Sequence, residues 1–284
     1  MEPSPIDRIV AWAQADEDIR AAILEGSMAA GFQFDELSDY DVNIFAFDRD
    51  KYLTDDRWMS QLGDVLLYQK EQFPFCGAVV PTRLILFRDR TRMDLSFWHP
   101  TTLSEIVSGN KEYEIYRNGY HILVDKDRLA ERLQPADGSG FLISPPARAA
   151  FLQTVYDFWF EAYCVARYLS RGDLWYAKLL ESRYIKDHLF RMALWNHQAA
   201  HVWKPNPVLH TEGKRFEKWA SSELVDAVSR CFSPYDVEDT WRSLSAMVEL
   251  FTRLARQTAI QLDIEYPDRT EQDIISYLQY LKDR

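Results

Sequence analysis

Two aspartates, Asp39 and Asp41, stand two residues apart at the start of an apolar stretch of the sequence. Alternate residues of a β-strand point to the same side, so a strand over residues 39–47 would carry both carboxylates on one face. Two neighbouring carboxylates repel each other, and burying them without a partner is costly. A divalent cation removes that cost, and Mg²⁺ is typically held by one or two carboxylates together with substrate phosphates. The pair therefore indicates metal-assisted phosphoryl chemistry.

A third carboxylate, Asp94, lies in the second arm of a predicted hairpin. Residues 81–98 form two alternating runs around the polar turn 88–90, which is typical of a hairpin. The apolar residues of the second arm share one face, and Asp94 takes the other. Three acids on strands around one point match a site of two metal ions about 3.5–4 Å apart, which bind the attacking and leaving oxygens.

Each of these acids also has an ordinary structural interpretation. The paired aspartates could be a loop end and a solvated strand end, and Asp94 could form an ion pair with Arg92 or Arg83. An isolated Asp-x-Asp motif is usually of this kind. The upstream turn at Gly26 and Ser27, together with the third acid, favours the metal site.

These motifs together resemble those of the polymerase-β-type nucleotidyltransferases, whose pattern is Gly-Ser, a spacer, Asp-x-Asp and a later Asp on a neighbouring strand. More narrowly, the chain is similar to the aminoglycoside 6-adenylyltransferases, also called streptomycin adenylyltransferases. The segments that carry the resemblance run in the same order along nearly the whole chain: residues 25–27, 37–42, 92–95, 157–160, 175–178 and 238–241.

The resemblance implies an antibiotic-resistance enzyme that transfers AMP from its co-substrate ATP to a hydroxyl of an aminoglycoside such as streptomycin, with release of pyrophosphate. It also implies two Mg²⁺ ions. Their ligands would be Asp39, Asp41 and Asp94, which would also be the catalytic residues. The nucleoside triphosphate and the cationic acceptor would contact residues of both halves of the chain. The nucleotide-binding residues would be Gly26, Ser27, Lys178 and Lys214, and the acceptor-binding residues Asp157 and Trp159.

Asp157 and Glu161 lie one helical turn apart among aromatic residues. Like charges at this spacing destabilise a helix by about 0.2–0.5 kcal/mol, so a cationic ligand would relieve their repulsion. Aromatic rings also favour cations on their faces. The alternatives are two solvated carboxylates and a core position for Trp159. Lysines such as Lys178 and Lys214 can bind phosphate as point charges, although most lysines on helices are simply solvated.

Two departures from the family pattern bear on the substrate. Met28 stands where the family usually has arginine after Gly-Ser, and residues 72–77 replace an acidic segment. Two other functions therefore stay open: a nucleotidyltransferase of the same fold that acts on another small molecule or on a protein partner, and a non-catalytic nucleotide-binding relative. A glycosidase is disfavoured, because acids two apart on one strand are too close for either glycosidase geometry.

Composition and charge are compatible with an enzyme that acts on a small-molecule substrate. The 284 residues include 33 Lys and Arg against 44 Asp and Glu, which gives a formal net charge of −11. Proteins that bind nucleic acid are usually basic, so we expect no nucleic-acid partner. An acidic surface attracts a cationic small molecule, although acidity also serves solubility. The sequence shows no signal peptide, membrane span, disulfide framework or zinc motif, so we expect a cytoplasmic protein without a membrane partner.

The elements that must position these residues divide into two predicted domains. A turn-rich stretch at 134–140, followed by two prolines, separates a nucleotidyltransferase domain (1–140) from a helical substrate-binding domain (145–284). The expected fold is α+β, with a mixed β-sheet flanked by helices, then an all-α domain, and the site in the cleft between them.

Periodicity predicts where the strands and helices of the two domains lie. The predicted strands are 42–47, 65–69, 82–87, 91–98 and 121–124. The predicted helices are 6–15 and 101–108 in the first domain, and 147–170, 174–195, 222–231, 237–262 and 271–281 in the second. Asp236 and Thr270 are candidate N-caps for the last two of these helices.

Overall fold

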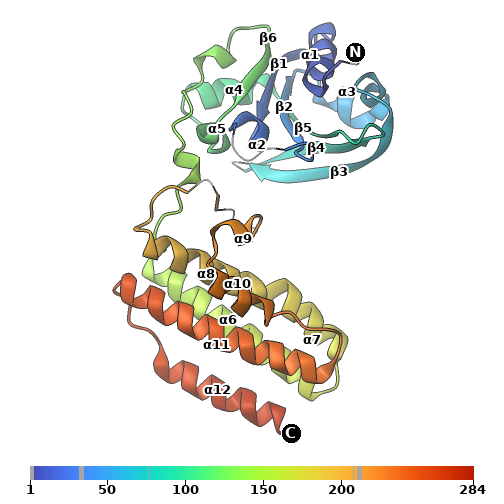
Figure 1. Ribbon diagram of the computed structural model, residues 1–284. Helices are drawn as coiled ribbons and strands as arrows, with labels where there is room; N and C mark the ends of the chain where they lie inside the picture. Colours follow the sequence, from blue (N-terminus) through green and yellow to red (C-terminus); the bar gives the residue numbers. More distant parts are fainter. Residues whose placement is uncertain (1–2, 32–34, 76, 207, 210–212) are drawn as a thin grey trace. The chain divides into compact units, whose positions relative to one another are not determined.

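The computed structural model of the chain describes residues 3–31, 35–75, 77–206, 208–209 and 213–284 (Figure 1). Cys76, which belongs to the segment that departs from the family pattern, lies outside the described residues. The chain forms two compact units, Met1–Phe141 and Leu142–Arg284. The described strands all lie in the first unit, and the regular elements described in the second are helices, so the predicted α+β fold class is confirmed.

The first unit is built on one six-stranded sheet with the strand order β3-β4-β5-β2-β1-β6. β2 and β5 are parallel and every other neighbouring pair is antiparallel, so the sheet is mixed. A parallel pair needs a long connection, which the β3–β4 hairpin and its preceding helices supply here. The strands are β1 (Ile19–Glu25), β2 (Tyr40–Ala46), β3 (Val65–Phe75), β4 (Ala78–Phe87), β5 (Arg92–Trp98) and β6 (His121–Asp125).

Helices cover both faces of this sheet. They are α1 (Pro5–Ala15), α2 (Gly26–Ala29), α3 (Arg49–Thr54), α4 (Pro100–Val107) and α5 (Ile115–Asn118). On one face, Ile44 shares a buried cluster with Trp12 of α1. On the other, Phe45 shares a cluster with Leu103 of α4. Neighbouring residues of β2 thus point to opposite faces, as the alternation predicts, and the strand is buried from position 42 onward.

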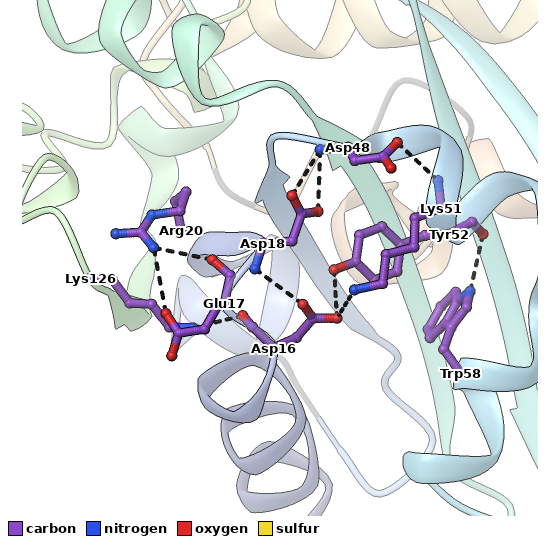
Figure 2. Close-up of polar contacts among 9 residues, drawn as sticks. All are labelled: Asp16, Glu17, Asp18, Arg20, Asp48, Lys51, Tyr52, Trp58 and Lys126. Carbon is purple, nitrogen blue, oxygen red and sulfur yellow. Dashed lines mark hydrogen bonds and ion pairs between the residues drawn. The ribbon is translucent and has the colours of Figure 1, made fainter.

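A polar cluster holds the ends of β1 and β2 that lie away from the paired aspartates (Figure 2). The Asp16 carboxylate accepts hydrogen bonds from Lys51 Nζ at 2.6 Å and from Tyr52 OH at 2.8 Å. The Asp18 carboxylate accepts the backbone N–H of Asp48 at 3.0 Å. These bonds link the start of β1 to the residues that follow β2, so the register of the two strands is fixed from this end.

The second unit is a bundle of helices around its own apolar core. Phe158 and Phe251 stack at its centre, with 3.6 Å between the ring centroids. Within the described part of the chain, no helix combines the length and apolarity that crossing a bilayer requires. The helices are α6 (Arg148–Ser170), α7 (Leu174–Leu180), α8 (Lys186–Ala200), α9 (Phe216–Trp219), α10 (Ser222–Ser229), α11 (Val237–Gln261) and α12 (Asp268–Lys282).

Each predicted strand is present, with ends shifted by a few residues, and β1 is an additional strand that the sequence patterns do not indicate. The predicted helix over 174–195 is divided in two. A π-helical turn at Glu181–Ile185 separates α7 from α8. The apolar periodicity continues across this turn, which is why the sequence alone suggests one helix.

The two predicted caps have different outcomes. Asp236 caps α11 as predicted, because its carboxylate accepts the backbone N–H of Asp239 at 2.9 Å. The prediction for Thr270 is wrong. α12 begins at Asp268, so Thr270 lies inside its first turn.

Candidate active site

The register of three neighbouring strands places carboxylates in one row across the sheet. Asp41 of β2 is paired with Asp94 of the parallel strand β5 and with Glu25 of the antiparallel strand β1. Paired residues lie beside each other on the same face. Asp39 comes one residue before β2 and two before Asp41. The acids therefore meet where β1 ends and where β2 and β5 begin.

Asp39, Asp41 and Asp94 form a compact acid triad. One carboxylate oxygen from each lies within 4.8 Å of the others, and all three residues are partly buried. Over the described ranges, this is the one group of three or more His, Cys, Asp or Glu residues close enough to share a metal ion. Carboxylate oxygens are the ligands that Mg²⁺ prefers, and partly exposed acids leave coordination positions for water and phosphate. The donor set therefore fits a divalent cation.

Arg92 supplies a positive charge to this triad. Its Nε and Nη2 atoms donate to the Asp94 carboxylate at 3.0 and 2.6 Å, and its Nη1 atom lies 3.6 Å from Asp39 Oδ2. The hydrogen bonds to Asp94 raise the pKa of Arg92. Arg83, the other candidate partner for Asp94, forms its ion pair with Asp56 instead, at 3.3 Å. A metal ion at the triad would compete with the Arg92 guanidinium for the same oxygens.

Replacing Arg92 with glutamine is expected to destabilise the metal-free protein, because the carboxylates then lose the attraction of the Arg92 guanidinium. A half-exposed ion pair contributes about 1 kcal/mol or less, so the melting temperature should fall by about 2–4 °C. Thermal unfolding in EDTA measures this loss, and added Mg²⁺ should restore it. A loss that Mg²⁺ leaves unchanged would show that Arg92 and the metal do not share these acids.

Gly26 brings the main chain directly against Asp41. Its φ of +72° lies in the left-handed region that favours glycine. A Cβ atom at this position would lie 2.3 Å from Asp41 Oδ2, so the Asp41 carboxylate or the main chain at Gly26 would have to move. Ser27 follows in the same turn and is partly buried. Met28 packs against the core of the first unit, so an apolar contact stands where the family usually has arginine.

Glu25 is a fourth acid of this row that the sequence patterns do not single out. Its side chain is 8% exposed, and it accepts hydrogen bonds from Tyr113 OH at 2.8 Å and from Asn43 Nδ2 at 2.5 Å. Burial raises the pKa of its carboxyl to about 8, and the charge of Asp41 acts in the same direction. The sequence signal that could have found it is a charged residue that closes an apolar run just before Gly26.

The described part of segment 72–77 forms the end of the β3–β4 hairpin. Phe75 packs edge-on against Trp98 and Tyr113, with ring centroids 5.0 and 5.4 Å apart. Both partners belong to the cluster on the sheet face that carries the acids. Aromatic packing therefore takes the place of the family's acidic segment.

Asp157 and Glu161 lie on α6 in the second unit, and both are partly buried. Asp157 Oδ1 accepts a hydrogen bond from Gln153 Nε2 at 2.7 Å. Burial raises the pKa of Glu161, and the charge of Asp157 adds to this effect. Among the ion pairs of the residues that the structure describes, none involves either acid. Two adjacent acids that form no ion pair with the described residues agree with a cationic ligand.

Trp159 lies in the core of the second unit. Its side chain is 2% exposed and packs edge-on against Phe158 and Phe251, with ring centroids 5.4 and 6.5 Å away. In this position the indole packs between α6 and α11 in the apolar core.

The two candidate phosphate-binding lysines also lie in the second unit and differ in their surroundings. Lys178 Nζ donates to the backbone oxygen and the Oγ atom of Ser233 at 3.0 and 2.9 Å, and it forms an ion pair with the fully buried Glu181. Lys214 is exposed. The Lys178 ammonium is therefore engaged inside the unit, whereas Lys214 faces solvent.

Comparison with known proteins bears on what this site does. A family model described as streptomycin adenylyltransferase matches residues 2–281. The chain belongs to this family. It is therefore a nucleotidyltransferase, and the resemblance inferred from the motifs is confirmed.

Three curated relatives are each named aminoglycoside 6-adenylyltransferase. The protein from Campylobacter jejuni is 25% identical over 274 residues, which cover 94% of this chain and 91% of the relative. The Bacillus subtilis (strain 168) protein is 25% identical over 279 residues, covering 95% and 94%. The Staphylococcus aureus protein is 22% identical over 275 residues, covering 94% of each. A crystal structure of an aminoglycoside 6-adenyltransferase from Bacillus subtilis covers 99% of each chain at 20% identity, with a TM-score of 0.48.

Proposed function

We propose that this nucleotidyltransferase moves AMP from ATP to a hydroxyl of an aminoglycoside such as streptomycin, and releases pyrophosphate. The observation that carries the proposal is the acid triad at the ends of β1, β2 and β5. Family membership and the names of the three relatives support it. Residues 1–140 would form the nucleotidyltransferase domain and residues 145–284 the substrate-binding domain.

In this proposal the first unit holds the metal and the nucleotide. Asp39 and Asp41 would bind two Mg²⁺ ions, and Asp94 would complete the ligand set of one of them. When bound, the ions stabilise the negative charge that develops on the transferred group. Gly26 and Ser27 would hold the phosphates, since a residue without a side chain lets the main chain approach them closely.

The second unit would bind the acceptor through Asp157. An aminoglycoside carries ammonium groups, which suit a pair of acids that form no ion pair with the described residues. The net charge of −11 would also attract such an acceptor. The roles of Lys178 and Lys214 with nucleotide and of Trp159 with acceptor stay predictions, as does a cytoplasmic location. Of the two lysines, the exposed Lys214 is the better candidate for binding phosphate, because the Lys178 ammonium already contacts Ser233 and Glu181.

Pyrophosphate release across the four nucleoside triphosphates tests the proposal. Each is supplied with Mg²⁺ and a panel of aminoglycosides, and the acceptor is weighed by mass spectrometry. We expect release with ATP that depends on both Mg²⁺ and an aminoglycoside, and an acceptor heavier by one adenylyl group. AMP that appears on a polypeptide would favour a protein acceptor, and no release with any combination would favour a non-catalytic nucleotide-binding protein.

Replacing Asp157 with asparagine is expected to weaken binding of the acceptor and to leave binding of the nucleotide unchanged. Loss of one charge-assisted hydrogen bond would reduce the binding free energy of the aminoglycoside by about 1.5–3 kcal/mol. Calorimetric titration of the acceptor and of MgATP into the variant separates the two ligands. Asp226, an exposed acid on α10, is the matched control, and Asp226→Asn should leave both affinities unchanged. Unchanged acceptor affinity in Asp157→Asn would make Asp157 an ordinary solvated carboxylate.

A further inference from the structure

Glu25 stands beside the acid triad without belonging to it. It is paired in register with Asp41, directly across β1 and β2. The acids close enough to share one ion are Asp39, Asp41 and Asp94, and Glu25 is not among them. A buried carboxylate that is next to a metal site, and is not itself a ligand there, needs another explanation.

The partners of Glu25 form a closed polar network under the triad. Glu25 accepts from Tyr113 OH and Asn43 Nδ2. The same Asn43 Nδ2 lies 3.0 Å from Tyr116 OH, and Asn43 Oδ1 accepts Trp98 Nε1 at 2.7 Å. All five side chains are at least nine-tenths buried. Hydrogen bonds in such an interior are strong, and a fully satisfied network specifies one arrangement of its members.

This network connects the two pieces of main chain that hold Asp41. Asn43 lies two residues after Asp41 on the same face of β2. Glu25 itself immediately precedes Gly26, whose α-carbon lies against the Asp41 carboxylate. The hydrogen bond between Asn43 and Glu25 therefore ties β2 to the turn that packs on Asp41. Without it, the backbone pairing of β1 with β2 remains, and this side-chain link between the two pieces is lost.

We propose that Glu25 is a positioning residue of the metal site. By holding Asn43 and Tyr113, it keeps the Asp41 carboxylate where a divalent cation binds. The inference rests on the proposed metal-dependent function, and it assigns to Glu25 no contact with the metal or the substrate. Substitution of residues that orient metal ligands typically costs about 10- to 100-fold in metal affinity.

Mn²⁺ binding to the full chain, followed by electron paramagnetic resonance without nucleotide, measures this role apart from turnover. Tyr113→Phe removes one hydrogen bond to Glu25, and Glu25→Leu removes both. We expect the Mn²⁺ dissociation constant to rise by about tenfold for Tyr113→Phe and by about 10- to 100-fold for Glu25→Leu. Glu25→Gln should bind Mn²⁺ within about threefold of the unmodified chain. Its amide can accept from Asn43 and donate to the Tyr113 oxygen, so one hydrogen bond to each partner remains, with the direction of the Tyr113 bond reversed.

Tyr52→Phe is the matched control for Tyr113→Phe. Tyr52 is also buried in the first unit, and its hydroxyl also donates to a carboxylate at 2.8 Å. Its partner, Asp16, lies at the opposite end of β1 (Figure 2). Both tyrosine variants should lose similar thermal stability, and only Tyr113→Phe should lose Mn²⁺ affinity.

Several results would overturn the proposal. Unchanged Mn²⁺ affinity in Tyr113→Phe would do so even if Glu25→Leu fails to fold. Equal losses of affinity in Tyr113→Phe and Tyr52→Phe would show a general effect of destabilisation. If Glu25→Gln binds Mn²⁺ as weakly as Glu25→Leu does, hydrogen bonding is not the role of Glu25. If the unmodified chain itself binds no Mn²⁺, the metal site fails, a result distinct from failure of Glu25 alone.

Discussion

The Asp41→Asn variant is expected to lose nearly all turnover while it keeps its fold. Asparagine has almost the size of aspartate and lacks the charge that holds a cation. Losing several kcal/mol of transition-state stabilisation lowers kcat by about 10³-fold or more. The melting temperature in EDTA should not fall, because the change relieves repulsion within the acid triad. Pyrophosphate release and thermal unfolding measure the two effects, and Asp39→Asn and Asp94→Asn should lose activity to a similar extent.

The matched control for this variant is Asp50→Asn. Asp50 is an exposed acid on α3, beyond the other end of β2. Its replacement removes the same charge from the first unit and should leave kcat unchanged. Activity near that of the unmodified chain in Asp41→Asn, Asp39→Asn or Asp94→Asn would remove that residue from the metal site.

Gly26→Ala is expected to lower kcat by about 10²-fold or more, although it adds a single methyl group. The new Cβ would lie 2.3 Å from Asp41 Oδ2, so the carboxylate or the turn must move. A displacement of about 1 Å in a catalytic group can cost this much in rate. Steady-state kinetics should show the loss chiefly in kcat, because the geometry of the reacting groups is what changes.

Gly31→Ala separates displacement of Asp41 from backbone strain. Gly31 has a φ of +63°, close to that of Gly26, and a Cβ built there meets no atom of the described residues within 4 Å. Both variants place alanine in the left-handed region and should lose about 1 kcal/mol of stability. Only Gly26→Ala should lose activity. Equal kinetic losses in the two variants would mean that contact with Asp41 is not the reason for glycine at position 26.

The acids of the triad could be predicted because strand alternation is a local property. The period of two puts Asp39 and Asp41 on one face, and it puts Asp94 opposite the apolar face of its own strand. Their meeting depends on the parallel register of β2 with β5, which no local pattern encodes. In this case the family resemblance supplied what periodicity could not.

Local sequence patterns did not predict β1 or the role of Glu25. The run Ile19–Glu25 is rich in alanine and shows no alternation, because β1 lies inside the sheet and is covered on both faces. The role of Glu25 depends on Tyr113, which is 88 positions away along the chain. A contact of that separation becomes visible only when the strands are assembled.

The helical half shows a similar limit. Lysine is a common phosphate partner, so the sequence offers Lys178 as a candidate phosphate ligand, with a simply solvated lysine as the alternative. The structure places Glu181 one turn later, fully buried, within a π-helical turn. A charge buried in this way needs a partner, and Lys178 provides it. Helical periodicity does not reveal which charged residues face the interior.

Anomalous scattering from crystals grown with Mn²⁺ and a non-hydrolysable ATP analogue tests the central claim most directly. We expect two manganese peaks about 3.5–4 Å apart, bound by Asp39, Asp41 and Asp94, with the Arg92 guanidinium displaced from Asp94. Triphosphate oxygens should complete the coordination beside Gly26. A bound analogue with no manganese at the three acids, and with Arg92 still hydrogen-bonded to Asp94, would contradict the metal-dependent mechanism.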